Sequence, residues 1–224
     1  MTSDFQVLLR DPAEAARRAI TGDASTLART ALVALVIGTA IYGGVLGTYR
    51  GELQIAYAAL KMPIVLLGAL VVTAPAVWAI GASRGRAWTV RAAGALVLVA
   101  AGRASLVLVT IAPLLWLAID VGVGYHFASL LSSCAFGLAG LVALGTLVRG
   151  VGRSGFLVGM VASVVFLSAL AQTGWALRPW LGRPSRPVVF VRTEPGVGPL
   201  ESFFASTHYG MEDPSGRSIE GDWQ

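Results

Sequence analysis

A charged side chain inside an apolar stretch is the first feature of this sequence that could do chemistry. Arg103 stands within a long apolar run that ends at Asp120. Charges at membrane depth are costly, so those that occur usually bind a partner or line a pathway. Residues 104–119 cover only about 24 Å of helix, and one more turn completes a hydrocarbon core of about 30 Å. We therefore prefer a position near one face, where Arg103 reaches lipid phosphates by snorkelling, to a buried functional charge, and both interpretations stay open.

Asp120 and His126 are a second set of chemically capable residues, because they flank a glycine-rich turn, Val121-Gly-Val-Gly-Tyr125. An aspartate and a histidine can relay protons or bind a metal ion. Two ligands are too few for a metal site, and no third ligand follows nearby in the sequence. We therefore expect a polar surface loop here and no metal ion.

Lys61 precedes an apolar stretch that begins at Met62 and contains two prolines, Pro63 and Pro75. A lysine at such a boundary typically anchors the helix in the headgroup layer. Pro63 in a first helical turn costs little, because the N–H groups there lack intrahelical partners. Pro75, and Pro113 in a later stretch, predict kinks, which occur at gates and cavities and also arise from packing alone.

Several enzyme and cofactor motifs are missing from the sequence. It contains no GxxxxGK[ST], no HExxH and no CxxC pattern, which are the signatures of nucleotide and zinc sites. Cys134 is the only cysteine, so it cannot form an intrachain disulfide. Acidic residues are absent deep inside the apolar stretches, which argues against proton- or sodium-coupled transport. We expect no enzymatic activity and no cofactor.

Five apolar stretches of near-bilayer length must position these residues. A helix of about 20 apolar residues crosses a bilayer, and a backbone in lipid must satisfy its own hydrogen bonds. The sequence therefore predicts an all-α, polytopic transmembrane helix bundle of about five spans. The approximate limits of the spans are 31–49, 62–80, a third that starts between 92 and 103 and ends at 120, 125–148 and 156–177.

The polar segments outside these spans divide the chain into three parts. Residues 1–29 form a polar N-terminal segment, residues 30–178 the membrane domain and residues 179–224 an extramembrane tail. The part between the first and second spans, 53–60, is moderately apolar and predicts either an interfacial segment or an outward extension of the second span. Likewise, 92–102 is either a separate interfacial helix or an extension of the third span.

The arginines predict the orientation of the bundle. They concentrate in the N-terminal segment and in the loops after the second and fourth spans. By the positive-inside rule the N-terminus is cytoplasmic, and five spans then place the tail on the opposite side. Only 13% of the residues are charged, the mean hydropathy is +0.72, and the net charge of +5 comes from arginines beside apolar stretches. We therefore expect a multi-pass membrane protein that does not bind nucleic acid.

Small residues recur inside two of the spans. Gly43 and Gly47 have GxxxG spacing in the first span, and Gly137 and Gly140 lie in the fourth. Small residues let helices approach closely where lipid offers no hydrophobic drive between them. The pattern predicts helix packing, either within the chain or in a homo-oligomer.

The N-terminal segment carries a helix signal. Asp11 is placed as an N-cap and Pro12 at the first helical position, which together predict a short helix over 12–20.

The tail begins with an anchor. Arg178, Pro179 and Trp180 should end the last span and hold the tail among the headgroups. Farther on, 186–192 favours a short strand and 199–205 one or two helical turns. An apolar strand needs cover in water, so the tail is expected either to dock a partner or to lie over the chain's own loops.

Two pairs of segments resemble a known group of proteins. They are Ile41–Gly51 with Ala58–Pro63, and Ala176–Pro184 with Pro187–Arg192. Together they resemble uncharacterised bacterial multi-pass membrane proteins that are loosely similar to the Yip-domain family. The resemblance implies about five spans, a location in the bacterial inner (cytoplasmic) membrane and no known catalysis, and it assigns no functional residues.

These observations lead to a functional expectation. We expect a non-catalytic subunit or organiser of a membrane assembly that binds membrane lipids and a membrane-protein partner or a second copy of itself. The alternative is a small-solute transporter or channel, which Arg103, Pro75 and Pro113 would serve.

Overall fold

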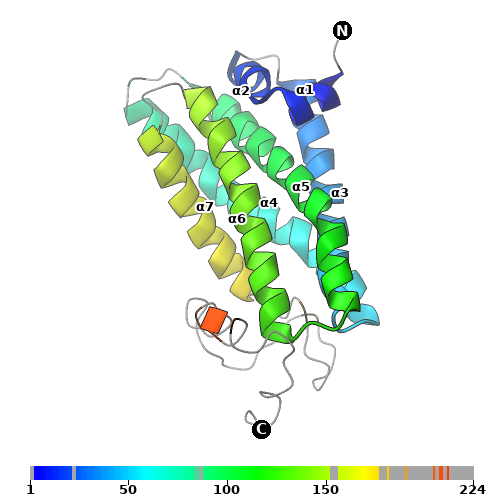
Figure 1. The fold of residues 1–224 in the computed structure, drawn as a ribbon. Helices are drawn as coiled ribbons and strands as arrows, with labels where there is room; N and C mark the ends of the chain where they lie inside the picture. Colours follow the sequence, from blue (N-terminus) through cyan, green and yellow to red (C-terminus); the bar gives the residue numbers. More distant parts are fainter. Residues whose placement is uncertain are drawn as a thin grey trace.

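The computed structural model describes residues 3–21, 24–83, 85, 88–151, 156–176, 181, 190, 204, 207–208 and 211. Within these residues the chain is helical and contains no strand, which confirms the predicted all-α class (Figure 1). The helices are α1 (Asp4–Arg10), α2 (Pro12–Thr21), α3 (Ser25–Gly47), α4 (Leu53–Ser83), α5 (Val90–Asp120), α6 (Tyr125–Val151) and α7 (Phe156–Ala176).

Four of these helices are long and apolar enough to cross a membrane. They are α3, α4, α5 and α6, in which the apolar stretches predicted for the first four spans lie. The fifth predicted span falls on α7, which has 21 residues and an apolar part, Gly159–Leu170, that is shorter than a span within the described residues. A multi-pass membrane protein is therefore what the helix lengths and compositions indicate.

Two boundaries that the sequence left open are decided by the structure. The segment 53–60 continues into α4, so it extends the second span outward. The segment 92–102 is the first part of α5, which runs without a break through Arg103. This part of α5 is apolar because α1, α2 and α6 pack on it, and it buries Leu96 and Val99 completely.

The helices form one bundle with a helical cap at one end. α5 contacts α3, α4 and α6, while α7 packs against α4 and α6. α1 and α2 lie across one end of the bundle, α1 against α3 and α5 and α2 against α5 and α6 (Figure 1). We call α1 and α2 the N-terminal cap.

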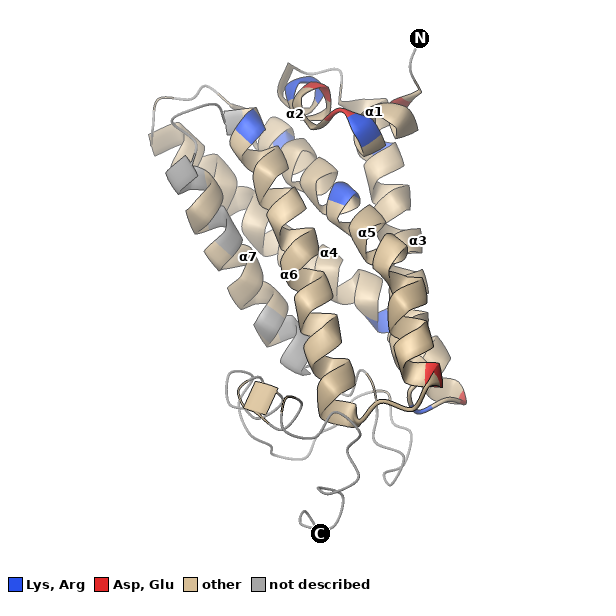
Figure 2. Cartoon of the chain, viewed as in Figure 1, with Lys and Arg blue, Asp and Glu red and all other residues tan. Residues whose placement is uncertain are grey.

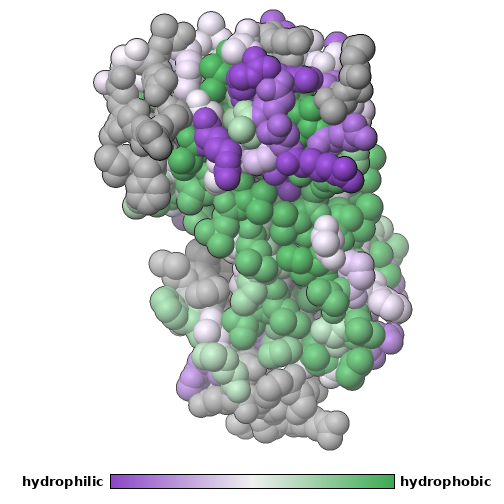
Figure 3. Space-filling view, turned by 45° about the horizontal axis from the view of Figure 1, so that its top comes forward, coloured by the Kyte–Doolittle hydropathy of each residue, from purple (hydrophilic) through white to green (hydrophobic). Residues whose placement is uncertain are grey.

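The charged residues gather at the two ends of the bundle. Figure 2 shows most of them around the N-terminal cap and, at the opposite end, near the loops beside α3 and α5, with a cation partway along each of α4 and α5. Between these ends the surface is a hydrophobic band (Figure 3). On α3 this band consists of exposed aliphatic side chains that recur with helical spacing, namely Leu32, Val33, Val36, Ile37 and Ile41.

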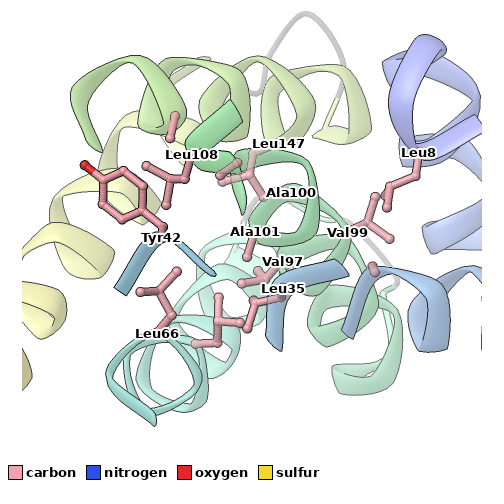
Figure 4. Close-up of a cluster of buried hydrophobic side chains, with 14 of the residues drawn as sticks. Leu8, Leu35, Tyr42, Leu66, Val97, Val99, Ala100, Ala101, Leu108 and Leu147 are labelled. Carbon is pink, nitrogen blue, oxygen red and sulfur yellow. The ribbon is translucent and has the colours of Figure 1, made fainter. Parts of the chain in front are cut away.

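The interior holds the cap and the spans together. Leu8 of α1 is fully buried and points toward Val99 of α5 (Figure 4). The same cluster of buried side chains continues through Leu35, Leu66 and Leu108 of the bundle. Burying a leucine side chain contributes about 1.5–3 kcal/mol in water, a drive that acts on the cap but is weak between helices in lipid.

Glycines allow the spans to touch at their backbones. A Cβ added to Gly43 would collide with the backbone of Ala58 and come within 2.8 Å of Met62 Cγ, both on α4. A Cβ on Gly47 would lie 2.8 Å from the backbone nitrogen of Ile55. Both glycines of the GxxxG pair thus face α4 of the same chain. A Cβ on Gly137 or Gly140, in contrast, would meet no atom of the described residues within 4 Å, so the structure does not place these two glycines at a helix contact within that part of the chain.

Candidate functional site

Arg103 joins the middle of α5 to the N-terminal cap. Its Nη1 donates a hydrogen bond to the carbonyl oxygen of Leu8, in the last turn of α1. The final carbonyls of a helix lack intrahelical partners, and a positive charge is favourable at that end of the helix dipole. Arg103 therefore caps α1 and attaches it to the bundle.

The surroundings of Arg103 are mixed in charge. Asp11 is the attractive charge near it, and Arg149 of α6 is the repulsive one. Arg149 donates from Nη1 to the carbonyl oxygen of Gly145 at 2.9 Å, within its own helix. The Nε of Arg103 is buried and has no hydrogen-bond partner among the described residues. The guanidinium therefore bonds to α1 through Nη1 while its Nε–H makes no hydrogen bond to these residues.

The depth of Arg103 follows from the contact between α5 and α3. A Cβ on Gly102 would lie 2.8 Å from the carbonyl oxygen of Ala31, so these two positions are level. Arg29 stands one half-turn before Ala31, and the helical distance from Arg29 to Arg50 is about 31 Å, which matches a hydrocarbon core of about 30 Å. Arg103 and Arg29 thus lie at the same boundary of the apolar band.

Lys61 forms a second cationic site on α4. Its side chain is fully buried, at 0% exposure, and its Nζ lies 4.8 Å from the centroid of the Phe190 ring. The Tyr57 ring meets the same phenylalanine edge-on, with centroids 5.3 Å apart. A cation over a ring face is attracted by the ring quadrupole. The structure differs here from the exposed headgroup anchor expected from the sequence, because Phe190 of the tail covers the lysine.

Asp120 and His126 stay at the loop between α5 and α6. Asp120 is the exposed last residue of α5, and Gly122 turns the chain with a φ of +86°. His126 is half-buried, with its ring 5.4 Å from that of Tyr125. Within the part of the chain that the structure describes, no group of three His, Cys, Asp or Glu side chains could hold a metal ion.

The tail residues singled out from the sequence lie mostly outside the described residues. This is true of Arg178, Pro179 and Trp180, of the helical turns expected over 199–205 apart from Phe204, and of the strand expected over 186–192 apart from Phe190. Two described residues of the tail do contact the bundle: Leu181 is buried in the core, and Phe190 covers Lys61.

Sequence reasoning missed three polar features. Ser105 donates to the carbonyl oxygens of Gly102, at 2.7 Å, and of Ala34, at 2.9 Å, so it bridges α5 to α3. Tyr42 donates to Ser132 Oγ at 3.1 Å in the interior. Small polar residues inside apolar spans are the signal that could have found both.

The third missed feature is a GxSxG pattern, Gly81-Ala-Ser-Arg-Gly85. This pattern supplies a nucleophile only where a strand turns into a helix. Here Ser83 is instead the last residue of helix α4, and its hydroxyl donates to the carbonyl oxygen of Ile80 at 2.9 Å. The local geometry is thus that of a helix end.

An ion-pair network stabilises the N-terminal cap. Asp11 Oδ1 accepts from the Glu14 N–H at 2.9 Å, and α2 begins at Pro12, which confirms the predicted start of this helix. Arg18 binds Glu14 of its own helix at 2.7 Å and Asp4 of α1 at 3.3 Å. Hydrogen bonds from Arg17 and then from Arg18 lower the pKa of Glu14 to about 2, so its carboxylate stays charged at neutral pH.

Comparisons with other proteins add no relative. No protein-family model, no curated protein and no solved structure matches this chain. The resemblance to Yip-domain-like proteins therefore stays a prediction.

Proposed function

We propose that this chain is a five-span protein of the bacterial inner membrane and serves as a non-catalytic subunit or organiser of a membrane assembly. In this proposal α7 is the fifth span, the N-terminal cap is cytoplasmic, and the tail lies on the opposite side. Binding of protein or lipid partners takes place through the segments at the two ends of the bundle.

One observation supports this proposal above all. Two cationic side chains inside the apolar parts of α4 and α5, Lys61 and Arg103, contact segments at the ends of the bundle. Arg103 bonds to the carbonyl oxygen of Leu8 in the cap, and Lys61 lies against Phe190 of the tail. Their charges hold the end segments on the bundle, and a fixed end segment is a surface that a partner can recognise without an ordering cost.

Close helix packing favours the same interpretation over transport. The α3–α4 and α3–α5 contacts bring backbones together at Gly43, Gly47 and Gly102, so no side chains separate the helices at these points. A transporter remains the competing function, and Pro75 and Pro113 inside the spans are the features in its favour.

Native purification tests the proposal. The full-length protein is extracted in mild detergent, and its mass is compared with that of the single chain. A stoichiometric partner or a homo-oligomer supports the proposal. A lone protein that moves small solutes across liposomes favours the transporter and overturns it. Reporter fusions at Gly22, Gly85 and Gln224 test the orientation, because a cytoplasmic signal at Gln224 contradicts five spans.

A further inference from the structure

We infer that α1 and the start of α3 form a binding site for anionic phospholipids at the boundary of the membrane. In this site Phe5 and Leu9 enter the outermost acyl layer, while Arg10 and Arg29 bind lipid phosphates. The inference deepens the lipid-binding part of the proposed function, and it rests on the insertion of the bundle in a membrane.

The depth of α1 is the first argument. The last turn of α1 is bonded to Arg103, and Gly102 beside it touches Ala31 of α3. The last turn of α1 therefore lies within reach of one arginine side chain from the level at which the exposed aliphatic stripe of α3 begins, at Leu32. A helix at this level meets the layer where headgroups give way to acyl chains.

The exposed face of α1 is the second argument. Val7 and Leu8 are buried against the bundle, while Phe5 and Leu9 are 50% and 48% exposed. Phe5 and Leu9 are four residues apart and so share one face of the helix. A face of this kind is unfavourable in water and favourable at the boundary between headgroups and acyl chains.

The charges beside this face are the third argument. Arg17 and Arg18 are engaged by Glu14 and Asp4. Arg10 and Arg29 are exposed, and neither has an acidic partner within ion-pair distance in the described part of the chain.

Arg29 lies one turn before the aliphatic stripe of α3. It shares a helix face with Val33, which follows it by four residues. An apolar face flanked by unpaired arginines is the pattern that attracts anionic lipid surfaces. The charge and the position of the site therefore both favour phospholipid phosphates as its occupant.

The first experiment measures the depth of α1 in the full-length protein. The exposed Cys134 is replaced by serine, and a spin label is placed at Leu9→Cys or, as control, at the exposed polar position Gln6→Cys. The protein is reconstituted in vesicles of phosphatidylcholine and phosphatidylglycerol. We expect the label at position 9 to be relaxed more by oxygen, which concentrates in lipid, than by a water-soluble nickel chelate, and the label at position 6 to show the reverse.

The second experiment measures lipid selectivity. The ratio of phosphatidylglycerol to phosphatidylcholine that stays bound after purification is compared between two variants of equal charge. We expect Arg10→Gln with Arg29→Gln to lower this ratio roughly thirtyfold, since each arginine near the surface contributes about 1 kcal/mol. The control, Arg17→Gln with Arg91→Gln, removes an arginine that Glu14 already engages and an exposed arginine that lies about 16 Å of helix before Gly102 on α5. It should therefore lower the ratio much less.

Three results would overturn the inference. They are a label at position 9 that prefers the nickel chelate, a label shielded from both reagents, as under a protein partner or a second copy, and an equal loss of lipid selectivity in both double variants. These results are separate from the test of the proposed function. A lone, transporting protein would end that proposal while leaving both lipid measurements as expected.

Discussion

Arg103 and Leu8 are 95 positions apart in the chain, yet the guanidinium of the first donates to the backbone carbonyl of the second. The bond joins a helix of membrane-spanning length to a seven-residue helix that could not persist alone in water. The position of the N-terminal cap is therefore coupled to a charge inside α5.

Replacing Arg103 by glutamine should release α1 from the bundle. A hydrogen bond from a charged donor contributes about 1.5–3 kcal/mol, so the free energy of opening the cap should fall by a similar amount. Hydrogen exchange of residues 3–10 in detergent measures this change. Arg91→Gln is the matched control, because Arg91 is an exposed arginine of the same helix. Unchanged exchange in Arg103→Gln would show that the bond does not hold the cap.

Adding a methyl group at Gly43 should destabilise the bundle. The new Cβ would collide with the backbone of Ala58 and with Met62, and overpacking of this kind costs about 1–3 kcal/mol. The thermal unfolding midpoint in detergent should fall for Gly43→Ala. Gly137→Ala is the control, since a Cβ there meets nothing within 4 Å, and equal midpoints for the two variants would contradict the α3–α4 contact.

Removing the Phe190 ring should expose Lys61 to reagents. Lys61 is the only lysine of the chain, so an amine-reactive label followed by peptide mapping reports on it alone once the N-terminal amine is set aside. In the native protein its side chain is buried, and we expect slow labelling that becomes several-fold faster in Phe190→Ala. Phe204→Ala is the control because Phe204 is largely exposed. Fast labelling of Lys61 in the native protein would show that Phe190 does not shield it.

The N-terminal cap should loosen in acid through Glu14. Its hydrogen bonds to Arg17 and Arg18 lower its pKa from an ordinary value of 4.5 to about 2. A depressed pKa stabilises the folded cap above the ordinary value, and this contribution is lost as the pH falls from 4.5 toward 2. The effect should be small because the pair is exposed to solvent. Hydrogen exchange of α2 should show this pH dependence in the native protein and lack it in Glu14→Gln.

The all-α class and most of the helices could be predicted from the sequence. Runs of apolar residues near bilayer length predict helices because a backbone in lipid has no water to bond with, and four of the predicted spans lie within long apolar helices of the structure. The start of α2 was equally predictable, since Asp11 and Pro12 act on the helix end beside them. These signals are local, and each depends on residues within a few turns.

The contacts of the charged residues could not be predicted from the sequence. The helical pattern around Arg103 does not reveal that Leu8 lies beside it, and the boundary position of Lys61 does not reveal that Phe190 covers it. The same limit applied to the first part of α5, which is apolar because the cap and α6 bury it. A local pattern predicts that a residue is buried, but it does not predict which segments bury it. Those segments are distant in the chain, and their positions depend on how the whole bundle packs.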